Sequence, residues 1–377
     1  MRARRLLTLG HSYVVSLNRR LAREMSLAGR GQWEVTCAAP RFFHADNDLA
    51  AVRLAKEHGD SFPIVELEAF LSSKVHLMMY GRGIRTLLRE PWDVVHAWEE
   101  PYILAGWQIS RLVHPRSTLV YLSAQNNSKV YPPPFSWFER ASMARAQGWA
   151  CTGRTVEQCL KGRAGYDRPH AVIPLGVDVD MFKPDREAGR RAKAELGWDS
   201  AGPPVIGFMG RFVAAKGVRV LTAALDRVRG PFRALFLGAG ELEGELQRWS
   251  EKYAGRVRIL YAPHAEVSTY VNAMDVLCAP SQTTPAWREQ FGRMLVEALA
   301  CAVPVVGSDS GEIPTVIADA GVVVGEQDIG GWALAVEQLL ASPARRTELG
   351  QAGLELARSR YAWPIVAREY LAFFESL

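Results

Sequence analysis

The sequence predicts an α/β protein with two domains, each built on a parallel β-sheet covered by helices. Three observations support this fold class. The chain has 377 residues, which is too long for one ordinary domain and suits two. It is 48% hydrophobic and 23% charged, the balance of a globular protein. Short strand-like runs alternate with helical runs from end to end, and such alternation produces parallel sheets.

The strand-like runs fall into two series. The first half of the chain contains Leu6–Leu9, Glu34–Ala38, Val94–Ala97, Leu119–Leu122 and Ala171–Pro174. The second half contains Val205–Phe208, Ala234–Leu237, Arg256–Leu260, Val276–Ala279, Val303–Val306 and Val322–Val324. Two such series imply two Rossmann-like domains, and we expect the boundary near residues 176–184. The tail from Tyr361 to Phe374 has the periodicity of an amphipathic helix.

The charge is divided unevenly between the two halves. Residues 1–176 hold 23 Lys and Arg against 15 Asp and Glu, a balance of +8, whereas the remainder has a balance of −3. A basic first half favours an anionic partner, such as a membrane surface or a lipid-diphosphate acceptor. An ordinary basic surface is the alternative. The basic residues are spread and follow no nucleic-acid-binding motif, so we expect no nucleic-acid partner.

No apolar run reaches the length of a membrane-spanning helix. The first ten residues begin like a signal sequence, but their apolar part is too short, so we expect them to form the first strand. The cysteines, at positions 37, 151, 159, 278 and 301, include no C-x-x-C pair. This pattern favours a reducing cytoplasm over disulfides or a zinc site. We therefore expect a cytoplasmic protein, with a peripheral contact at the inner face of the membrane.

The most informative segment is E-Q-F-G-R-M-L-V-E-A-L-A-C-A-V-P-V-V-G-S-D-S-G-E-I-P, residues 289–314. It sets Glu289 and Glu297 on either side of a predicted helix start, roughly 12 Å apart at about 1.5 Å per residue. The amide groups of Phe291 and Gly292 would face a phosphate group there. Gly292 also permits a close backbone approach. The alternative is a surface helix with two solvated glutamates.

A second segment supports the first. The predicted strand Val205–Phe208 leads to Gly210 and Arg211, and Lys216 follows five residues later at the start of a helix. The Arg211 guanidinium can bind phosphate oxygens in a forked geometry, and Lys216 adds a compact charge. The spacing is not that of a Walker A loop. Two solvated cations beside a loop are the alternative.

These segments, with the phrase I-P-L-G-V-D-V-D-M-F-K-P at residues 173–184, resemble the retaining glycosyltransferases of family 4, particularly the polysaccharide-biosynthesis type. The resemblance implies the GT-B fold, in which two Rossmann-like domains face each other across a cleft and the last helix crosses back to the first domain. It assigns residues 1–176 and 358–377 to acceptor binding and residues 177–357 to nucleotide-sugar binding. It implies no cofactor and no metal, so we interpret Asp178-Val179-Asp180 as structural.

The resemblance also implies a role for each matching residue on the donor side. Arg211 and Lys216, after Gly210, would hold the diphosphate, assisted by the amides of Phe291 and Gly292. Glu297 would bind ribose hydroxyls and Glu289 hexose hydroxyls. The nucleobase, uracil or guanine, would pack near Tyr261–His264.

The acceptor side departs from the family pattern. Residues 92–101 look like the family's strand-to-loop signature, but the next strand lacks the histidine that many members carry there. It ends instead in Gln125 and Asn126, similar to a subgroup in which Y-P-P-P-F follows. The acceptor-side candidates are His11, Tyr13, Glu100, Gln125 and Asn126. The catalytic candidates are Glu289, Arg211, Lys216 and Gln125. Residues 71–82 mix apolar and basic side chains, as in a bilayer contact or a packed helix with basic ends.

The predicted function is therefore retaining transfer of a hexose from a nucleoside-diphosphate sugar to a saccharide or lipid-linked acceptor, in cell-envelope polysaccharide or glycolipid synthesis. Two alternatives remain. A relative on the same fold could bind sugar nucleotides without transfer, or act as an epimerase. A nucleotide-dependent oxidoreductase could use the glycine-rich turn at residues 237–244, but no acidic residue ends the next strand, as such proteins require.

Overall fold

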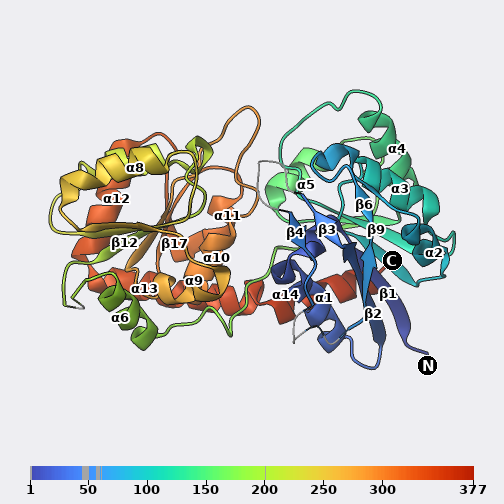
Figure 1. Cartoon of the computed structure of the whole chain (residues 1–377), viewed down its shortest axis with the longest axis horizontal. Helices are drawn as coiled ribbons and strands as arrows, with labels where there is room; N and C mark the ends of the chain where they lie inside the picture. Colours follow the sequence, from blue (N-terminus) through green and yellow to red (C-terminus); the bar gives the residue numbers. More distant parts are fainter. Residues whose placement is uncertain (1, 45–50, 57–59, 61, 200) are drawn as a thin grey trace. The chain divides into compact units, whose positions relative to one another are not determined.

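The computed structural model describes residues 2–44, 51–56, 60, 62–199 and 201–377 (Figure 1). The chain forms two compact units. The N-unit extends to Pro174 and also includes Trp363–Leu377, and the C-unit comprises Leu175–Ala362. The sequence placed these divisions at residues 176/177 and 357/358; in the structure they lie at 174/175 and 362/363.

The N-unit is built on a seven-stranded parallel sheet, in the order β11-β10-β9-β8-β1-β2-β5. These strands are β1 (Arg4–Leu9), β2 (Trp33–Pro40), β5 (Ile64–Leu67), β8 (Val94–Ala97), β9 (Thr118–Ser123), β10 (Gly148–Cys151) and β11 (His170–Val172). Alternate residues pack on opposite faces: Leu7 enters one core, whereas Leu6 enters the other. Both faces are covered, so the strands are continuously apolar rather than alternating.

Helices cover both faces of this sheet (Figure 1). They are α1 (Ser16–Ala28), α2 (Gly83–Arg89), α3 (Leu104–Leu112), α4 (Phe135–Arg145), α5 (Arg154–Leu160) and α14 (Trp363–Glu375). Helix α14 follows the C-unit in sequence yet packs on α1, where Trp363, Tyr370 and Phe374 share a core with Leu21 and Met25. The predicted return of the last helix to the first domain is therefore confirmed.

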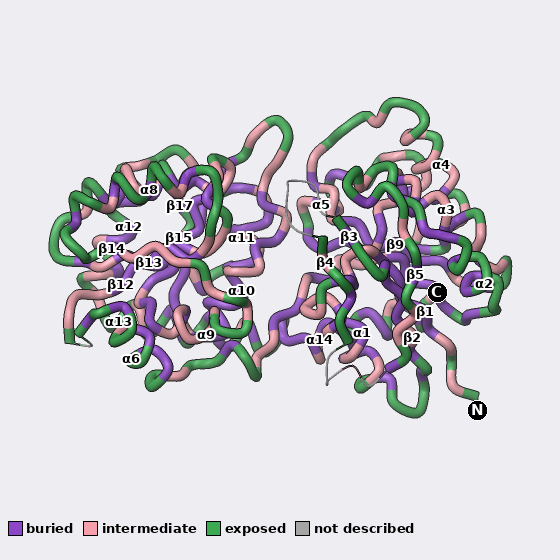
Figure 2. The backbone as a smooth tube through the Cα atoms, in the orientation of Figure 1, coloured by how far each residue is buried: buried purple, intermediate pink, exposed green. Residues whose placement is uncertain are grey.

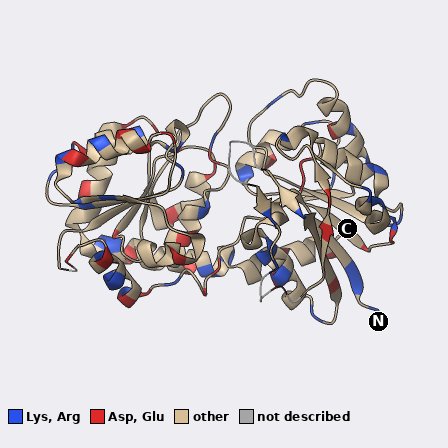
Figure 3. Ribbon diagram, viewed as in Figure 1, with Lys and Arg blue, Asp and Glu red and all other residues tan. Residues whose placement is uncertain are grey.

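The C-unit is built on a six-stranded parallel sheet, in the order β14-β13-β12-β15-β16-β17. Its strands are β12 (Val205–Met209), β13 (Arg233–Leu237), β14 (Val257–Leu260), β15 (Val276–Ala279), β16 (Val305–Ser308) and β17 (Gly321–Val324). Its helices are α6 (Arg186–Glu195), α7 (Val218–Leu225), α8 (Glu243–Ser250), α9 (His264–Val271), α10 (Arg293–Ala300), α11 (Ile313–Ile317), α12 (Ile329–Ala341) and α13 (Pro343–Leu356). The four inner strands β13, β12, β15 and β16 are largely buried, and the charged residues lie mainly on helices and loops (Figures 2 and 3).

The structure corrects three local expectations. The helix predicted from Phe291 begins at Arg293, because Gly292 has a left-handed φ of 80°. The strand predicted from Val303 begins at Val305, after a proline that lacks an N–H to donate. Residues 71–82 form no α-helix; a single 3-10 turn, Val75–Leu77, separates β6 (Ala69–Phe70) from its antiparallel partner β7 (Met79–Tyr80).

The sequence also gave no sign of the second short antiparallel pair, β3 (Phe42–Phe43) with β4 (Val52–Arg53). All five cysteines are buried, and none of them forms a disulfide. Within the described ranges, no helix has both the length and the apolar content needed to cross a membrane.

Candidate active site

The donor-side candidates follow two neighbouring strands of the C-unit. Gly210, Arg211 and Lys216 come after β12, and Glu289 comes after β15. Strand β12 pairs with β13 on one side and β15 on the other, so the strand order reverses at this position. Open α/β sheets bind ligands beyond the carboxyl ends of the strands at such a reversal. The fold therefore brings these segments together at the position where a ligand site is expected.

Lys216 and Glu289 form an ion pair at this position. The Lys216 Nζ lies 2.6 Å from Glu289 Oε2, and both side chains are largely buried, at 15% and 7% exposure. Ser281 Oγ donates a second hydrogen bond to the same carboxylate oxygen, at 2.8 Å. The Lys216 ammonium also lies 4.8 Å from the centre of the Trp287 ring. These contacts hold one cation and one carboxylate in fixed positions, a few ångströms apart.

Backbone contacts hold the loops that carry this pair. Gly217 has a φ of 72°, and a Cβ there would lie 1.8 Å from the carbonyl oxygen of Pro280. Gly311 has a φ of 57°, and a Cβ there would lie 2.0 Å from the carbonyl oxygen of Glu289. The Glu312 amide donates to that same oxygen at 3.0 Å. Only glycine permits these close approaches, so the positions of Lys216 and Glu289 depend on both residues.

Arg211 is the second cation after β12. Its side chain is exposed and has no hydrogen-bond or ion-pair partner among the described residues. Gly210 precedes it with a φ of 145° and open space where a Cβ would be. The Gly210 amide donates to the Leu237 carbonyl at 2.9 Å, which fixes the loop to β13. A flexible guanidinium on a fixed loop suits an anionic ligand.

The glycine-rich turn after β13 packs against this same loop. A Cβ on Gly238 would lie 1.9 Å from the Gly210 carbonyl oxygen, and one on Gly240 would lie 2.6 Å from that of Phe212. These two glycines therefore allow two loops to pack closely. This packing explains them without the dinucleotide site that an oxidoreductase would need.

The start of α10 shows which atoms of the predicted phosphate site are accessible. The Phe291 ring enters the core and packs 5.8 Å from the Tyr361 ring, so only its backbone could contact a ligand. In the part of the chain that the structure describes, neither the Phe291 nor the Gly292 amide donates a hydrogen bond. Glu289 precedes α10, so the rise per residue of a helix does not give its distance from Glu297. The loop before α10 sets the position of Glu289 instead.

Glu297 lies inside α10 and is buried. His264, at the start of α9, is 3.4 Å from it through Nε2, and the His264 ring packs 5.6 Å from that of Phe182. Arg293, which the sequence did not single out, is partly buried on the same helix; burial lowers the pKa of its guanidinium, and Glu297 opposes this effect. Tyr261 is 75% exposed, as a surface for a nucleobase would be.

In the N-unit, His11 is held by a buried carboxylate. The His11 backbone N–H and Nδ1 lie 2.7 and 2.6 Å from the two oxygens of Glu99, and Tyr80 donates its hydroxyl to Glu99 at 2.5 Å. The ring stacks on Phe43 at 4.8 Å. Burial, the largest single effect, lowers the pKa of His11, but the charge and hydrogen bond of Glu99 and the charge of Glu100 together raise the net pKa. The sequence predicted His11 here but not Glu99.

Glu100 occupies the end of the neighbouring strand. It accepts hydrogen bonds from the Ser123 hydroxyl at 2.7 Å and the Ala124 amide at 2.8 Å. Burial nevertheless raises the pKa of Glu100 to about 7. Gln125 follows and donates its side-chain amide to the Tyr131 hydroxyl. Glu100 and Gln125 therefore lie at the same edge of the N-unit sheet.

Two acceptor-side candidates are less accessible than expected. Tyr13 is fully buried, and its hydroxyl lies 2.6 Å from Thr8 Oγ1, so we assign it a packing role. Asn126 is also buried, at 1% exposure.

In the linker phrase, Asp178 Oδ1 accepts hydrogen bonds from the amides of Asp180 and Met181, which makes it part of a turn.

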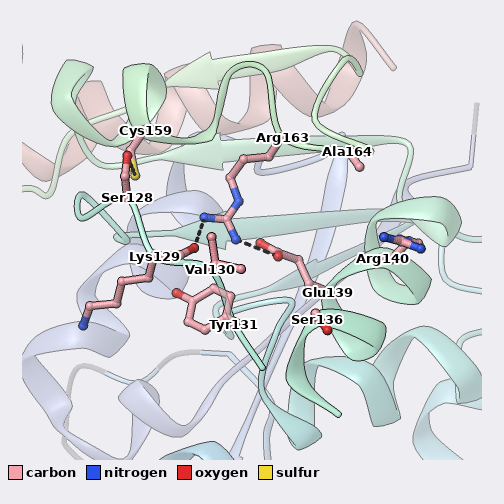
Figure 4. Close-up of a pocket in the computed structure, with 10 residues that line it drawn as sticks. All are labelled: Ser128, Lys129, Val130, Tyr131, Ser136, Glu139, Arg140, Cys159, Arg163 and Ala164. Atoms are coloured by element: carbon pink, nitrogen blue, oxygen red, sulfur yellow. Dashed lines mark hydrogen bonds and ion pairs between the residues drawn. The ribbon is translucent and has the colours of Figure 1, made fainter. Parts of the chain in front are cut away.

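A cavity of about 390 Å³ adjoins Gln125 through Tyr131 (Figure 4). Arg163 spans it, donating to the Glu139 carboxylate at 2.7 Å and to the Lys129 carbonyl at 3.0 Å. The Tyr131 ring stacks on that of Tyr102 at 4.0 Å. Stacked aromatic rings beside a polar clamp suit a saccharide.

Comparisons with known families and proteins agree with this architecture. The family described as "Glycosyltransferase Family 4" matches residues 13–181, and that described as "Glycosyl transferases group 1" matches residues 203–342. The D-inositol 3-phosphate glycosyltransferase of Segniliparus rotundus is 33% identical over 217 residues, which cover 54% of this chain and 46% of that protein. A GDP-mannose-dependent alpha-(1-6)-phosphatidylinositol monomannoside mannosyltransferase of Mycolicibacterium smegmatis is 33% identical over 201 residues, covering 51% and 52%. The chain thus spans about half the length of these relatives.

Solved structures match over the full chain. Sucrose-phosphate synthase from Thermosynechococcus elongatus has a TM-score of 0.75 at 20% identity, covering 99% of this chain and 98% of that one. Anabaena HepE in complex with UDP and glucose has a TM-score of 0.73 at 17% identity, covering 99% and 100%. Two parallel-sheet units with a returning last helix therefore define the GT-B class of fold. Within that class, the chain belongs to the family 4 glycosyltransferases, which confirms the resemblance.

We predict that Gly217→Ala will disrupt the donor side, whereas Gly230→Ala will not. Both glycines have a positive φ, 72° and 94°, but only Gly217 faces a backbone oxygen; Gly230 has open space. Gly230→Ala should cost about 1 kcal/mol from the left-handed backbone alone. Gly217→Ala should cost roughly 1–3 kcal/mol more, from overpacking. Urea unfolding checks this prediction, and equal losses of stability would contradict it.

We also predict that Glu100→Gln will change how stability depends on pH. The pKa of Glu100 is raised from 4.5 to about 7 in the folded protein, so the folded state binds this proton more tightly than the unfolded state. The stability from this group is fully present below the unfolded pKa and is lost as pH rises through about 7. Urea unfolding from pH 4.5 to 7.5 should therefore show the wild type losing stability relative to Glu100→Gln. Parallel curves would mean that Glu100 titrates normally.

Proposed function

We propose that this protein is a retaining glycosyltransferase that moves a hexose from a nucleoside-diphosphate sugar to an acceptor hydroxyl. The observation that carries this proposal is the Lys216–Glu289 ion pair after two adjacent strands whose order reverses. A sugar nucleotide presents a diphosphate beside a neutral, hydroxyl-rich sugar. The cation can bind the diphosphate, and the carboxylate beside it can accept hydrogen bonds from the sugar hydroxyls.

On the donor side, we propose that Lys216 and Arg211 bind the diphosphate, together with the amides of Phe291 and Gly292. The Lys216 ammonium has three protons, and its bond to Glu289 uses one, so two can reach phosphate oxygens. Glu289 would accept hydrogen bonds from hexose hydroxyls, and Glu297 would accept them from the ribose. The base would pack near His264 and the exposed Tyr261.

These groups support a reaction in which the leaving group is stabilised on the donor side. The bond between the sugar C1 and the diphosphate oxygen breaks, and a bond from the acceptor oxygen to C1 forms on the same face. The acceptor proton passes to the departing diphosphate. Lys216 and Arg211 would balance the charge that develops there, so the reaction would need no metal.

The N-unit would bind the acceptor through residues at the ends of its strands, namely His11, Glu100 and Gln125. The relatives' names include a phosphatidylinositol mannoside and an inositol phosphate acceptor, which supports a cell-envelope glycolipid or saccharide. Those names and the solved complex suggest GDP- or UDP-linked donors. We propose a cytoplasmic protein whose basic N-unit contacts the membrane peripherally.

Thermal unfolding with UDP, GDP, ADP, dTDP, NAD and NADP tests the donor class. A ligand at about 100 times its Kd should add roughly 2.7 kcal/mol of stability. We expect a shift with one nucleoside diphosphate, which Lys216→Ala abolishes. The control is Lys252→Ala, which removes an exposed ion pair with Asp226 in the same unit.

The donor so identified is then tested for transfer, with and without EDTA. We expect transfer with retention of the anomeric configuration and no effect of EDTA. A shift with only NAD or NADP would favour an oxidoreductase. Donor binding without any transfer would favour a non-transferring or epimerase relative, and activity restored by magnesium would contradict the metal-free reaction.

A further inference from the structure

The N-unit has a second cavity, and Tyr80, which donates its hydroxyl to Glu99, is one of the residues that line it. The cavity has a volume of about 670 Å³. It is formed by Phe70 at the end of β6, by β7 and the two residues that follow it, and by helices α2 and α3. The residues that matter here are Phe70, Met79, Arg82, Arg85, Arg89 and Gln108. None of the residues that line it is acidic.

Three arginines occupy one side of this cavity. Arg82, Arg85 and Arg89 are spaced i, i+3 and i+7, so they share one face of α2. All three are exposed, and none of their side chains has a hydrogen-bond or ion-pair partner among the described residues. Neighbouring like charges destabilise a helix, so this arrangement costs stability when nothing is bound.

Nearby carboxylates do not neutralise this side. Glu90 directly follows Arg89 but pairs with Arg5 at 2.5 Å. Another carboxylate nearby is that of Glu68, whose Oε2 would lie 3.1 Å from a Cβ on Gly81, the residue before Arg82. Three guanidinium groups and one carboxylate leave the site with a net positive charge.

The floor of the cavity is rigid. Gln108 on α3 accepts a hydrogen bond from the Tyr80 amide at 2.8 Å and donates one to the Tyr80 carbonyl at 2.7 Å. Gly81 donates to the Glu68 carbonyl at 2.8 Å. Strand β7 is therefore fixed to α3, and the arginines extend beside a fixed surface.

Exposed apolar side chains border the arginines. Phe70 and Leu71 are 54% and 58% exposed, and Leu77 and Met79 are each 38% exposed. All four belong to the β6–β7 segment, which we call the apolar rim, and Phe70 and Met79 also line the cavity. Adjacent anionic and apolar groups are the defining feature of a phospholipid at the surface of a bilayer.

We propose that this cavity binds a phosphate ester through Arg82, Arg85 and Arg89. The guanidinium groups match phosphate oxygens in geometry and charge. The phosphate could belong to a membrane lipid or to a soluble ester, and the apolar rim distinguishes the two sources. This inference does not depend on sugar transfer, because its test measures binding without a donor.

The test compares the triple variant Arg82→Gln, Arg85→Gln, Arg89→Gln with a control of equal charge. The control replaces Arg2, Arg30 and Arg116, which are also exposed residues of the N-unit outside this cavity. The probes are glycerol phosphate in solution and phosphatidylcholine vesicles with and without phosphatidylglycerol. Loss of the three arginines should weaken binding to anionic vesicles roughly a hundredfold. The control triple should bind like the wild type.

A further variant, Phe70→Ser with Leu71→Ser, separates the two sources of phosphate. Weaker vesicle binding with unchanged glycerol phosphate binding would identify a lipid, and unchanged binding of both would identify a soluble ester. Equal losses in the two triple variants would overturn the proposal, because net charge alone would then explain binding. The proposal would also be overturned if the triple variant that lacks the cavity arginines bound both probes as tightly as the wild type does. Nucleotide binding, measured separately, shows whether the donor proposal stands in either case.

Discussion

The ion pair between Lys216 and Glu289 is the interaction on which the proposed donor site depends. Each charge is largely buried, and a buried charge without its partner is costly. Its geometry rests on glycines that admit close backbone contacts, Gly217 against Pro280 and Gly311 against Glu289. Sequence positions more than 70 residues apart are thus joined because β12 and β15 are neighbours in the sheet.

The two units place charge at their strand ends in different ways. In the C-unit the Glu289 carboxylate is paired with the Lys216 cation, whereas in the N-unit Glu100 accepts hydrogen bonds from the neutral Ser123 hydroxyl and Ala124 amide. Burial raises the pKa of a carboxylate, and hydrogen bonds from neutral donors oppose this effect only in part at Glu100. The pKa of Glu100 is therefore raised. The N-unit is thus suited to hydrogen-bond a hydroxylated ligand, and the C-unit to hold an anionic one.

The sequence predicted the architecture well because buried parallel strands are continuously apolar. Val94–Ala97 and Val276–Ala279 were predicted with their final bounds. Strands of two residues, such as β3 and β6, have too few positions to show a period. Glu99 and Glu100 are adjacent in the sequence, which does not indicate which of them binds His11. That choice depends on tertiary packing. The same limit applies to Tyr13, which was expected at a ligand surface but lies in the core. The predicted helix start at Phe291 was two residues early, because Gly292 delays the helix.

The most direct test of the central claim is calorimetric titration of wild type and Glu289→Gln with the selected nucleoside diphosphate and with its sugar-linked form. If Glu289 binds the hexose, only the sugar-linked ligand should lose affinity, by about 1.5–3 kcal/mol for hydrogen bonds to a charged group. The nucleoside diphosphate should bind as tightly or more tightly, because Lys216 gains a free proton donor. Equal losses for both ligands, or no loss for either, would contradict the proposed division of roles between Glu289 and Lys216.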